Sequence, residues 1–124
     1  MKGYRFYMQD FKVNILGSEW SVKFGNEKEY PNLAEMDGYT DSSTKDIIVD
    51  DMKTSCGQVG IKADLESYQK QVVRHEIIHA FLAESGLESC SNKAESWATN
   101  EEMVDWFAIQ SPKIFKVFNE LKVM

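Results

Sequence analysis

The segment from Asp64 to Gly86 limits most strongly what this chain can fold into, because it is the longest stretch with a clear helical period. Asp64 suits the N-cap of a helix, and Gly86 suits a left-handed cap at its C-terminal end. Apolar residues between them recur at spacings of three and four: Leu65, Tyr68, Val72, Val73, Ile77, Ala80 and Phe81. The sequence therefore predicts one long helix over residues 65–85.

The 2 histidines of the chain lie in the middle of this helix, within the pentapeptide His75-Glu76-Ile77-Ile78-His79. Side chains four residues apart on a helix lie one turn above one another, so both imidazoles can reach the same ion. Imidazole suits Zn²⁺, and a glutamate beside a zinc-bound water can take its proton. The pattern predicts one Zn²⁺ ion with His75 and His79 as ligands and Glu76 as the general base.

A third protein ligand must come from elsewhere, because no histidine remains. Glu101 and Asp105 are four residues apart in a second segment of helical period, so their side chains project to the same side. We expect Glu101 to bind zinc and Asp105 to steady a histidine by accepting a hydrogen bond from its far ring nitrogen. Glu102 is an alternative ligand, because sequence patterns locate a helix only to within a residue or two. Cys56 and Cys90 are less favoured alternatives.

The first half of the chain has the alternation of apolar and polar residues that is typical of a small sheet. The predicted strands cover residues 11–16, 20–25, 36–40 and 47–49. Gly17-Ser18 between the first two suits a two-residue type II′ hairpin turn, and a polar turn at 41–44 links the last two. Residues 26–35 are expected to form a loop.

The last third of the chain is predicted to hold one or two helices. Asn92 and Thr99 each have a glutamate three residues later and are competing helix starts. Ser111-Pro112 suits the end of that helix and the start of a final one. The apolar face of the final helix and the three tryptophans are expected to pack in the core: Ile114, Phe115, Phe118, Leu121, Trp20, Trp97 and Trp106.

Length and composition favour a single globular domain over residues 1–124. The chain has 124 residues, of which 43% are hydrophobic and 27% charged, close to the globular average. The expected fold class is α+β, with a small, mostly antiparallel N-terminal sheet packed on the helix that carries the histidines and on one or two C-terminal helices.

Charge and patterning exclude several kinds of partner. A formal net charge of −6 opposes binding to the phosphate backbone, so we expect no nucleic-acid partner. No apolar run is long enough to span a bilayer and the N-terminus lacks the pattern of a signal peptide, so we expect a cytoplasmic protein with no membrane partner. Cys56 and Cys90 lack the spacing of a disulfide framework and are expected to be free thiols.

Taken together, the motifs resemble those of the gluzincin branch of zinc metallopeptidases. The His-Glu-x-x-His motif from His75 to His79 precedes Asn100-Glu101-x-x-x-Asp105, which is similar to the Asn-Glu-x-x-x-Asp of thermolysin-like enzymes. Over residues 36–112 the plan is similar to that of the small ImmA/IrrE-type peptidases of bacteria, phages and other mobile elements. The resemblance implies a minimal zincin-like metallopeptidase domain.

By this resemblance the chain would hydrolyse a bond in a peptide or protein substrate. A zinc-activated water would attack the carbonyl after Glu76 has taken its proton, and Ile47-Ile48-Val49 would be the edge strand that lines the cleft. Larger family members stabilise the tetrahedral intermediate with a histidine or tyrosine that has no assignable counterpart here. Tyr39 and Tyr68 are candidates for this role by residue type.

Two other functions fit the same residues. A regulatory or binding protein could keep the zinc site and cleave nothing. A zinc hydrolase could also use the same metal chemistry on a substrate other than protein.

Overall fold

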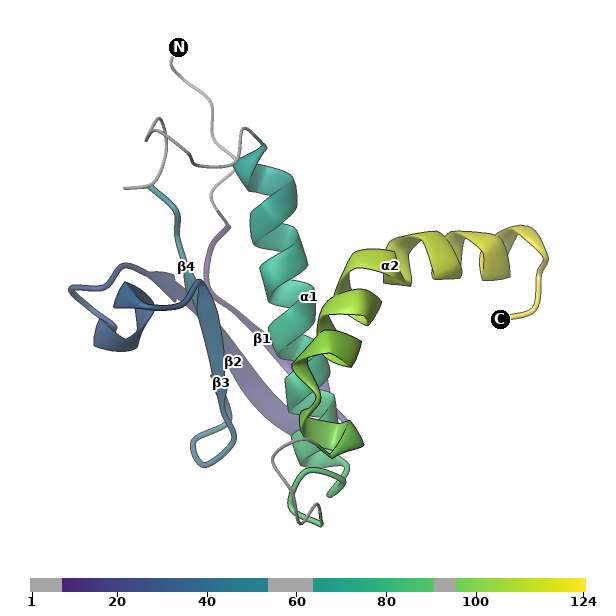
Figure 1. The fold of residues 1–124 in the computed structure, drawn as a ribbon, viewed down its shortest axis with the longest axis horizontal. Helices are drawn as coiled ribbons and strands as arrows, with labels where there is room; N and C mark the ends of the chain where they lie inside the picture. The colour runs from purple at the N-terminus through teal and green to yellow at the C-terminus, as the bar shows by residue number, and fades with distance from the viewer. Residues whose placement is uncertain (1–7, 54–63, 91–95) are drawn as a thin grey trace.

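The computed structural model of the chain describes residues 8–53, 64–90 and 96–124. Four strands come first, followed by two long helices (Figure 1). The elements in chain order are β1 (Phe11–Ile15), β2 (Ser18–Gly25), the 3-10 helix η1 (Pro31–Ala34), β3 (Gly38–Asp41), β4 (Asp46–Asp50), α1 (Leu65–Glu84), the 3-10 helix η2 (Trp97–Thr99) and α2 (Glu101–Glu120). This is the small α+β fold that the sequence predicts.

The strands form one sheet in the order β1-β2-β4-β3. β1 pairs antiparallel with β2, β3 pairs antiparallel with β4, and a parallel pairing of β2 with β4 joins the two hairpins. The expectation that Ile47-Ile48-Val49 forms the sheet edge is therefore wrong. All three side chains are buried, and such a continuous apolar run suits a strand covered on both faces. The edge strand on this side is β3.

The first hairpin turns one residue earlier than predicted. Ile15 pairs with Ser18, so the two central residues are Leu16 and Gly17, not Gly17 and Ser18. Their φ angles are 51° and 97°, and positive φ at both positions indicates a type I′ turn in place of type II′. The side chain of Asn14 supports the turn by accepting a hydrogen bond from the Gly17 N–H at 3.0 Å.

Helix α1 lies against one face of the sheet (Figure 1) and has the ends that the sequence predicts to within a residue. The Asp64 carboxylate accepts a hydrogen bond from the Ser67 N–H at 3.0 Å, and Gly86, with φ of 89°, follows the last turn. The buried core between helix and sheet consists of Ile15, Trp20, Val22, Ile47, Val49, Met52, Leu65, Val72, Val73 and Ala80. α1 is thus held on the sheet by the buried core.

Helix α2 begins at Glu101 with Asn100 as its N-cap. The Asn100 side chain accepts a hydrogen bond from the Met103 N–H at 2.7 Å. The predicted start at Thr99 is one residue early, because Thr99 closes the preceding 3-10 turn. The rival start at Asn92 lies outside the described residues.

The predicted break at Ser111-Pro112 is wrong, because α2 continues through Pro112. Proline has no N–H, so the carbonyl of Ala108 lacks its usual helical donor. Arg74 of α1 supplies one, since its Nε donates to the Ala108 oxygen at 2.6 Å. Ser111 is buried at this junction instead of capping a separate helix. The bond ties α2 to α1 one residue before His75.

The C-terminal arm, residues 113–124, projects away from the rest of the molecule (Figure 1). Its predicted packing in the core is wrong, since the exposed apolar side chains include Phe115, Phe118 and Leu121. Trp97 and Trp106 are exposed as well, whereas Trp20 is buried as expected. Within the described residues, neither long helix combines the length and apolar character that crossing a membrane requires.

Candidate metal centre

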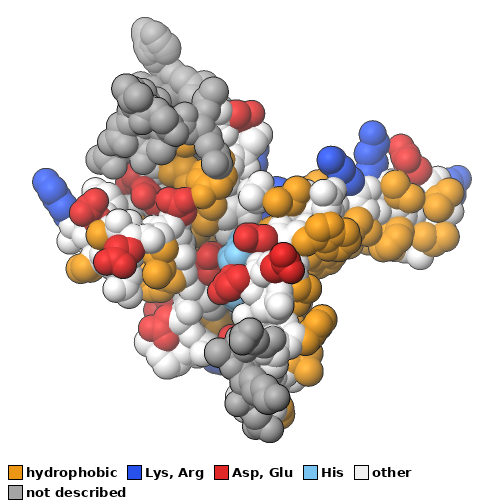
Figure 2. All heavy atoms as spheres, in the orientation of Figure 1, with side chains coloured by type: hydrophobic (Ala, Val, Ile, Leu, Met, Phe, Trp, Pro, Cys, Tyr) orange, Lys and Arg blue, Asp and Glu red, His pale blue; other side chains and the backbone are white. Residues whose placement is uncertain are grey.

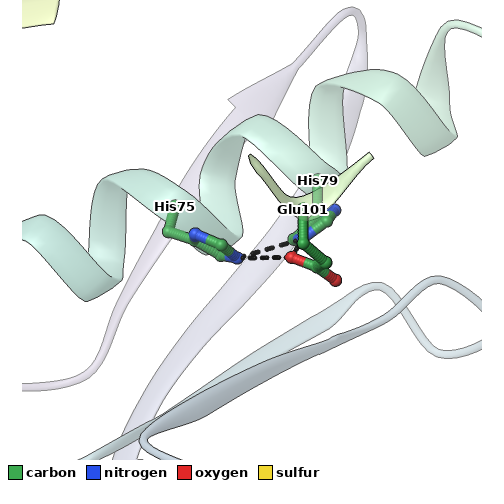
Figure 3. A group of neighbouring side chains, drawn as sticks. All are labelled: His75, His79 and Glu101. Atoms are coloured by element: carbon green, nitrogen blue, oxygen red, sulfur yellow. Dashed lines mark hydrogen bonds and ion pairs between the residues drawn. The ribbon is translucent and has the colours of Figure 1, made fainter. Parts of the chain in front are cut away.

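His75 and His79 extend from one side of α1 toward the first turn of α2 (Figure 3). Their Nε2 atoms are 3.1 Å apart, and Oε1 of Glu101 lies 3.0 Å from each of them. The structure thus brings together, from two helices, the three residues that the sequence nominates as ligands. In the described part of the chain, no other histidine, cysteine or acidic residues form a group of this kind.

The three ligand atoms fit a zinc ion. A tetrahedral Zn²⁺ with bonds of about 2.0–2.1 Å separates its ligand atoms by about 3.3 Å. The three separations here, 3.0, 3.0 and 3.1 Å, lie within a few tenths of an ångström of that value. Two imidazoles and one carboxylate also form a ligand set that zinc accepts in catalytic sites, where a fourth position stays open for water or substrate.

The hydrogen bond between His75 and Asp105 also favours a cation between His75 and Glu101. Its Nδ1 lies 2.7 Å from Oδ1 of Asp105, and the hydrogen bond holds the proton of a neutral ring on that nitrogen. The lone pair of Nε2 then faces the carboxylate oxygen of Glu101. Two acceptor atoms 3.0 Å apart repel each other unless a proton or a metal ion lies between them.

The alternative ligands lie outside this cluster. Glu102 is exposed and, unlike Glu101, does not belong to the group around the histidines. Cys90 is an exposed free thiol that also lies outside the group. Cys56 lies outside the described residues.

Glu76 lies beside the ligand atoms without joining them. Its Oε2 is 3.9 Å from Nε2 of His75, while the hydroxyl of Thr40 lies 2.8 Å from its Oε1 and 3.0 Å from its main-chain oxygen. Burial raises the pKa of the Glu76 carboxyl group above its ordinary value, against the opposing effects of the Thr40 hydrogen bond and the two histidines. The result is a buried carboxylate in a fixed orientation at the edge of the site.

Thr40 is the contact residue of Glu76 that the sequence analysis did not predict. It lies on β3, and Gly38 of the same strand allows β3 to approach α1 closely. A Cβ at Gly38 would lie 2.9 Å from Cγ1 of Val72 and 3.3 Å from Cγ of Glu76. Residues 38 and 40 share one face of a strand, and this was the only signal in the sequence. It could not show that the face covers Glu76.

A cavity of about 480 Å³ opens onto the metal centre, with β3 along one side and α1 along the other. Its volume lies within the range of small-ligand and substrate pockets. In the orientation of Figure 2, imidazole surface is visible near the centre of this face, surrounded by acidic side chains. Among the described strands, β3 pairs with β4 alone, so its outer edge can accept an added strand beside the cavity.

The two tyrosines named as candidates lie in different places. Tyr39 lines the large cavity together with the metal centre, and burial raises the pKa of its phenol. Tyr68 lines a smaller cavity of about 170 Å³ beside His75, and its hydroxyl donates to Asp37. Side chains alternate along a strand, so the Tyr39 side chain lies on the face of β3 opposite to that of Gly38 and Thr40, which covers Glu76.

No known family model, no curated protein and no solved structure matches the chain. Any functional assignment therefore depends on the chemistry of the site. That chemistry is set by the His-Glu-x-x-His and Asn-Glu-x-x-x-Asp motifs and by the short distances between His75, His79 and Glu101.

Proposed function

We propose that the chain is a zinc-dependent peptidase of the gluzincin type, similar to the small ImmA/IrrE-type enzymes. His75, His79 and Glu101 would hold the ion, and Asp105 would orient the His75 ring. When bound there, Zn²⁺ supplies Lewis acidity that polarises a carbonyl and lowers the pKa of water to about 7. The proposed substrate is an extended peptide or protein segment.

The residues of the chain perform the remaining steps of the proposed hydrolysis. Glu76 accepts a proton from the attacking water and returns it to the leaving amine. The edge of β3 that pairs with no described strand binds the backbone of the substrate by main-chain hydrogen bonds, which favours a peptide over a non-peptide substrate.

The arrangement of four side chains carries this proposal. Three ligand atoms lie 3.0–3.1 Å apart, and the carboxylate of Glu76 lies 3.9 Å from one of them without being a ligand itself. A metal site that only stabilised the fold would have a closed set of ligands and no need for a buried carboxylate facing an open cavity. We further propose that the enzyme acts in the cytoplasm, where an exposed thiol such as Cys90 stays reduced.

The test compares wild type with Glu76→Gln on a mixture of fluorogenic peptides, with zinc content measured in parallel. Glu76→Gln keeps the shape and removes the base, so we expect unchanged zinc content and a loss of turnover of at least about 100-fold. Equal hydrolysis by the two proteins would disprove the role of Glu76. A zinc-loaded wild type that binds these peptides and cleaves none of them would indicate a regulatory or binding protein instead.

A further inference from the structure

An apolar groove lies between α1 and α2, and none of its lining residues belongs to the cavity at the metal centre. Its volume is about 450 Å³ and its lining is entirely apolar. The main lining residues are Ile78, Phe81, Leu82, Trp97, Trp106 and Phe107. Trp97 and Trp106 expose 60% and 58% of their surface, far more than tryptophan usually exposes in a monomer.

The C-terminal arm presents a second uncovered apolar surface. Phe115 and Phe118 expose 42% and 40% of their surface, and Leu121 exposes 66%. Phe115 packs on Phe107 and Phe118, with ring centroids 6.2 and 6.4 Å apart. Hydrophobic side chains continue from the groove side of the molecule along one side of the arm (Figure 2). Without a covering partner, so short an apolar helical end is of marginal stability in water.

The arm cannot fill the groove of its own chain. The groove is built in part from Trp106 and Phe107, which lie in the same continuous helix as the arm. A helix cannot pack against itself, and reversing the chain would have to unwind α2 at Ala108 and Ser111, which are both buried. The arm therefore does not cover the groove of its own chain.

We propose that a second copy of this chain covers both surfaces, with the arm of each copy lying in the groove of the other around a two-fold axis. Such an exchange is self-complementary, because each chain carries one groove and one arm. Charge favours it as well. The arm has Lys113, Lys116 and Lys122 against a single glutamate, Glu120, whereas the whole chain has a net charge of −6, so a basic arm would approach an acidic body.

The exposed aromatic area reaches the lower limit for a specific interface between two copies. Five aromatic side chains of groove and arm are 40–60% exposed: Phe81, Trp97, Trp106, Phe115 and Phe118. At roughly 200 Å² for each side chain, they expose on the order of 500 Å² per chain. Covering them in both copies would bury about 1,000 Å², the size at which specific interfaces begin. This inference does not depend on the proposed peptidase activity.

The test measures the mass of the full-length chain by light scattering and sedimentation over a range of micromolar concentrations. We expect wild type to be a dimer. Phe118→Glu in the arm and Trp106→Lys in the groove should each weaken dimerisation at least about tenfold, because each places a charge in an apolar contact. Leu16→Asp is the matched control. Leu16 is an exposed apolar residue on the distant hairpin, and its positive φ suits aspartate.

Mixing the two variants, at a concentration where each alone is mostly monomeric, provides the decisive step. The Phe118→Glu chain keeps a wild-type groove and the Trp106→Lys chain keeps a wild-type arm, so one of the two contacts is intact in the mixed dimer. The other contact pairs Glu with Lys. We expect the mixture to form a heterodimer, and a mixture that stays monomeric would overturn the proposal. A wild type that is monomeric throughout would also overturn it, and binding of that monomer to anionic lipid vesicles would assign the arm to a membrane surface.

Discussion

At the scale of single residues, each functional atom of the proposed centre is oriented by a neighbouring side chain. Asp105 holds the His75 ring through Nδ1 at 2.7 Å, and Thr40 holds Glu76 through Oε1 at 2.8 Å. Such contacts keep reacting groups within a fraction of an ångström of a productive geometry. Thr40 binds Oε1 of Glu76, and the other carboxylate oxygen, Oε2, is the one that lies 3.9 Å from Nε2 of His75.

Removing the Thr40 hydroxyl tests this orientation. Valine has nearly the same shape as threonine, so Thr40→Val should leave the fold and the zinc content unchanged. We expect kcat to fall about tenfold while KM changes little, because a loosely held base transfers protons less effectively. Thr40→Ser keeps the hydroxyl and should retain most of the activity. If Thr40→Val has the kcat of wild type, Thr40 does not position Glu76.

The sequence predicts the residues of the centre that share a helix, but not the contact between Thr40 and Glu76. His75, Glu76 and His79 follow from spacing within one helix, and Glu101 with Asp105 follows from spacing within another. Thr40 lies 36 residues before Glu76 in the chain. Its contact depends on how close β3 approaches α1, which the sequence of the strand alone does not determine.

At the scale of elements, the joint between α1 and α2 decides whether Glu101 meets the two histidines. Pro112 leaves the Ala108 carbonyl without a helical donor, and Arg74 supplies the missing hydrogen bond across the helix interface at 2.6 Å. Arg74 directly precedes His75 on α1. The joint therefore fixes α2 close to the residue whose ring faces both Glu101 and Asp105.

A double-mutant cycle measures how much the hydrogen bond from Arg74 to the Ala108 carbonyl contributes to stability. Arg74→Met keeps the length of the side chain and removes the donor, so the free energy of unfolding in urea should fall by about 1–3 kcal/mol. In Pro112→Ala the helix regains an N–H for the Ala108 carbonyl, and the loss caused by Arg74→Met should shrink to less than half. An equal loss in both backgrounds would show that Arg74 stabilises the protein in another way.

Three predictions about elements are wrong, each for a physical reason. Proline usually ends a helix pattern, but here a side chain from α1 replaces the missing helical bond. The strand Ile47-Ile48-Val49 was expected at the sheet edge through a family resemblance, although its unbroken apolar run favours an interior position. The helix at the C-terminus was expected in the core on the basis of its apolar face. An apolar face shows that a helix needs a partner, not which partner it has.

At the scale of the whole molecule, the centre lies where two parts of the fold meet. The hydrophobic core fixes α1 on the sheet, whereas Glu101 and Asp105 belong to a helix that packs outside that core. An ion held by His75, His79 and Glu101 would join these two parts. Because such an ion binds only the folded chain, it would also stabilise the protein by mass action.

Zinc content of the purified protein and of a set of variants tests this central claim most directly. We expect about one zinc per wild-type chain, retained in Glu102→Ala and in Glu76→Gln and lost in His75→Ala, His79→Ala and Glu101→Ala. Glu102→Ala is the matched control, because it removes an adjacent exposed carboxylate from the same turn of α2. Zinc-free wild type that does not take up the ion, or a Glu101→Ala variant that binds zinc as tightly as wild type, would contradict the account.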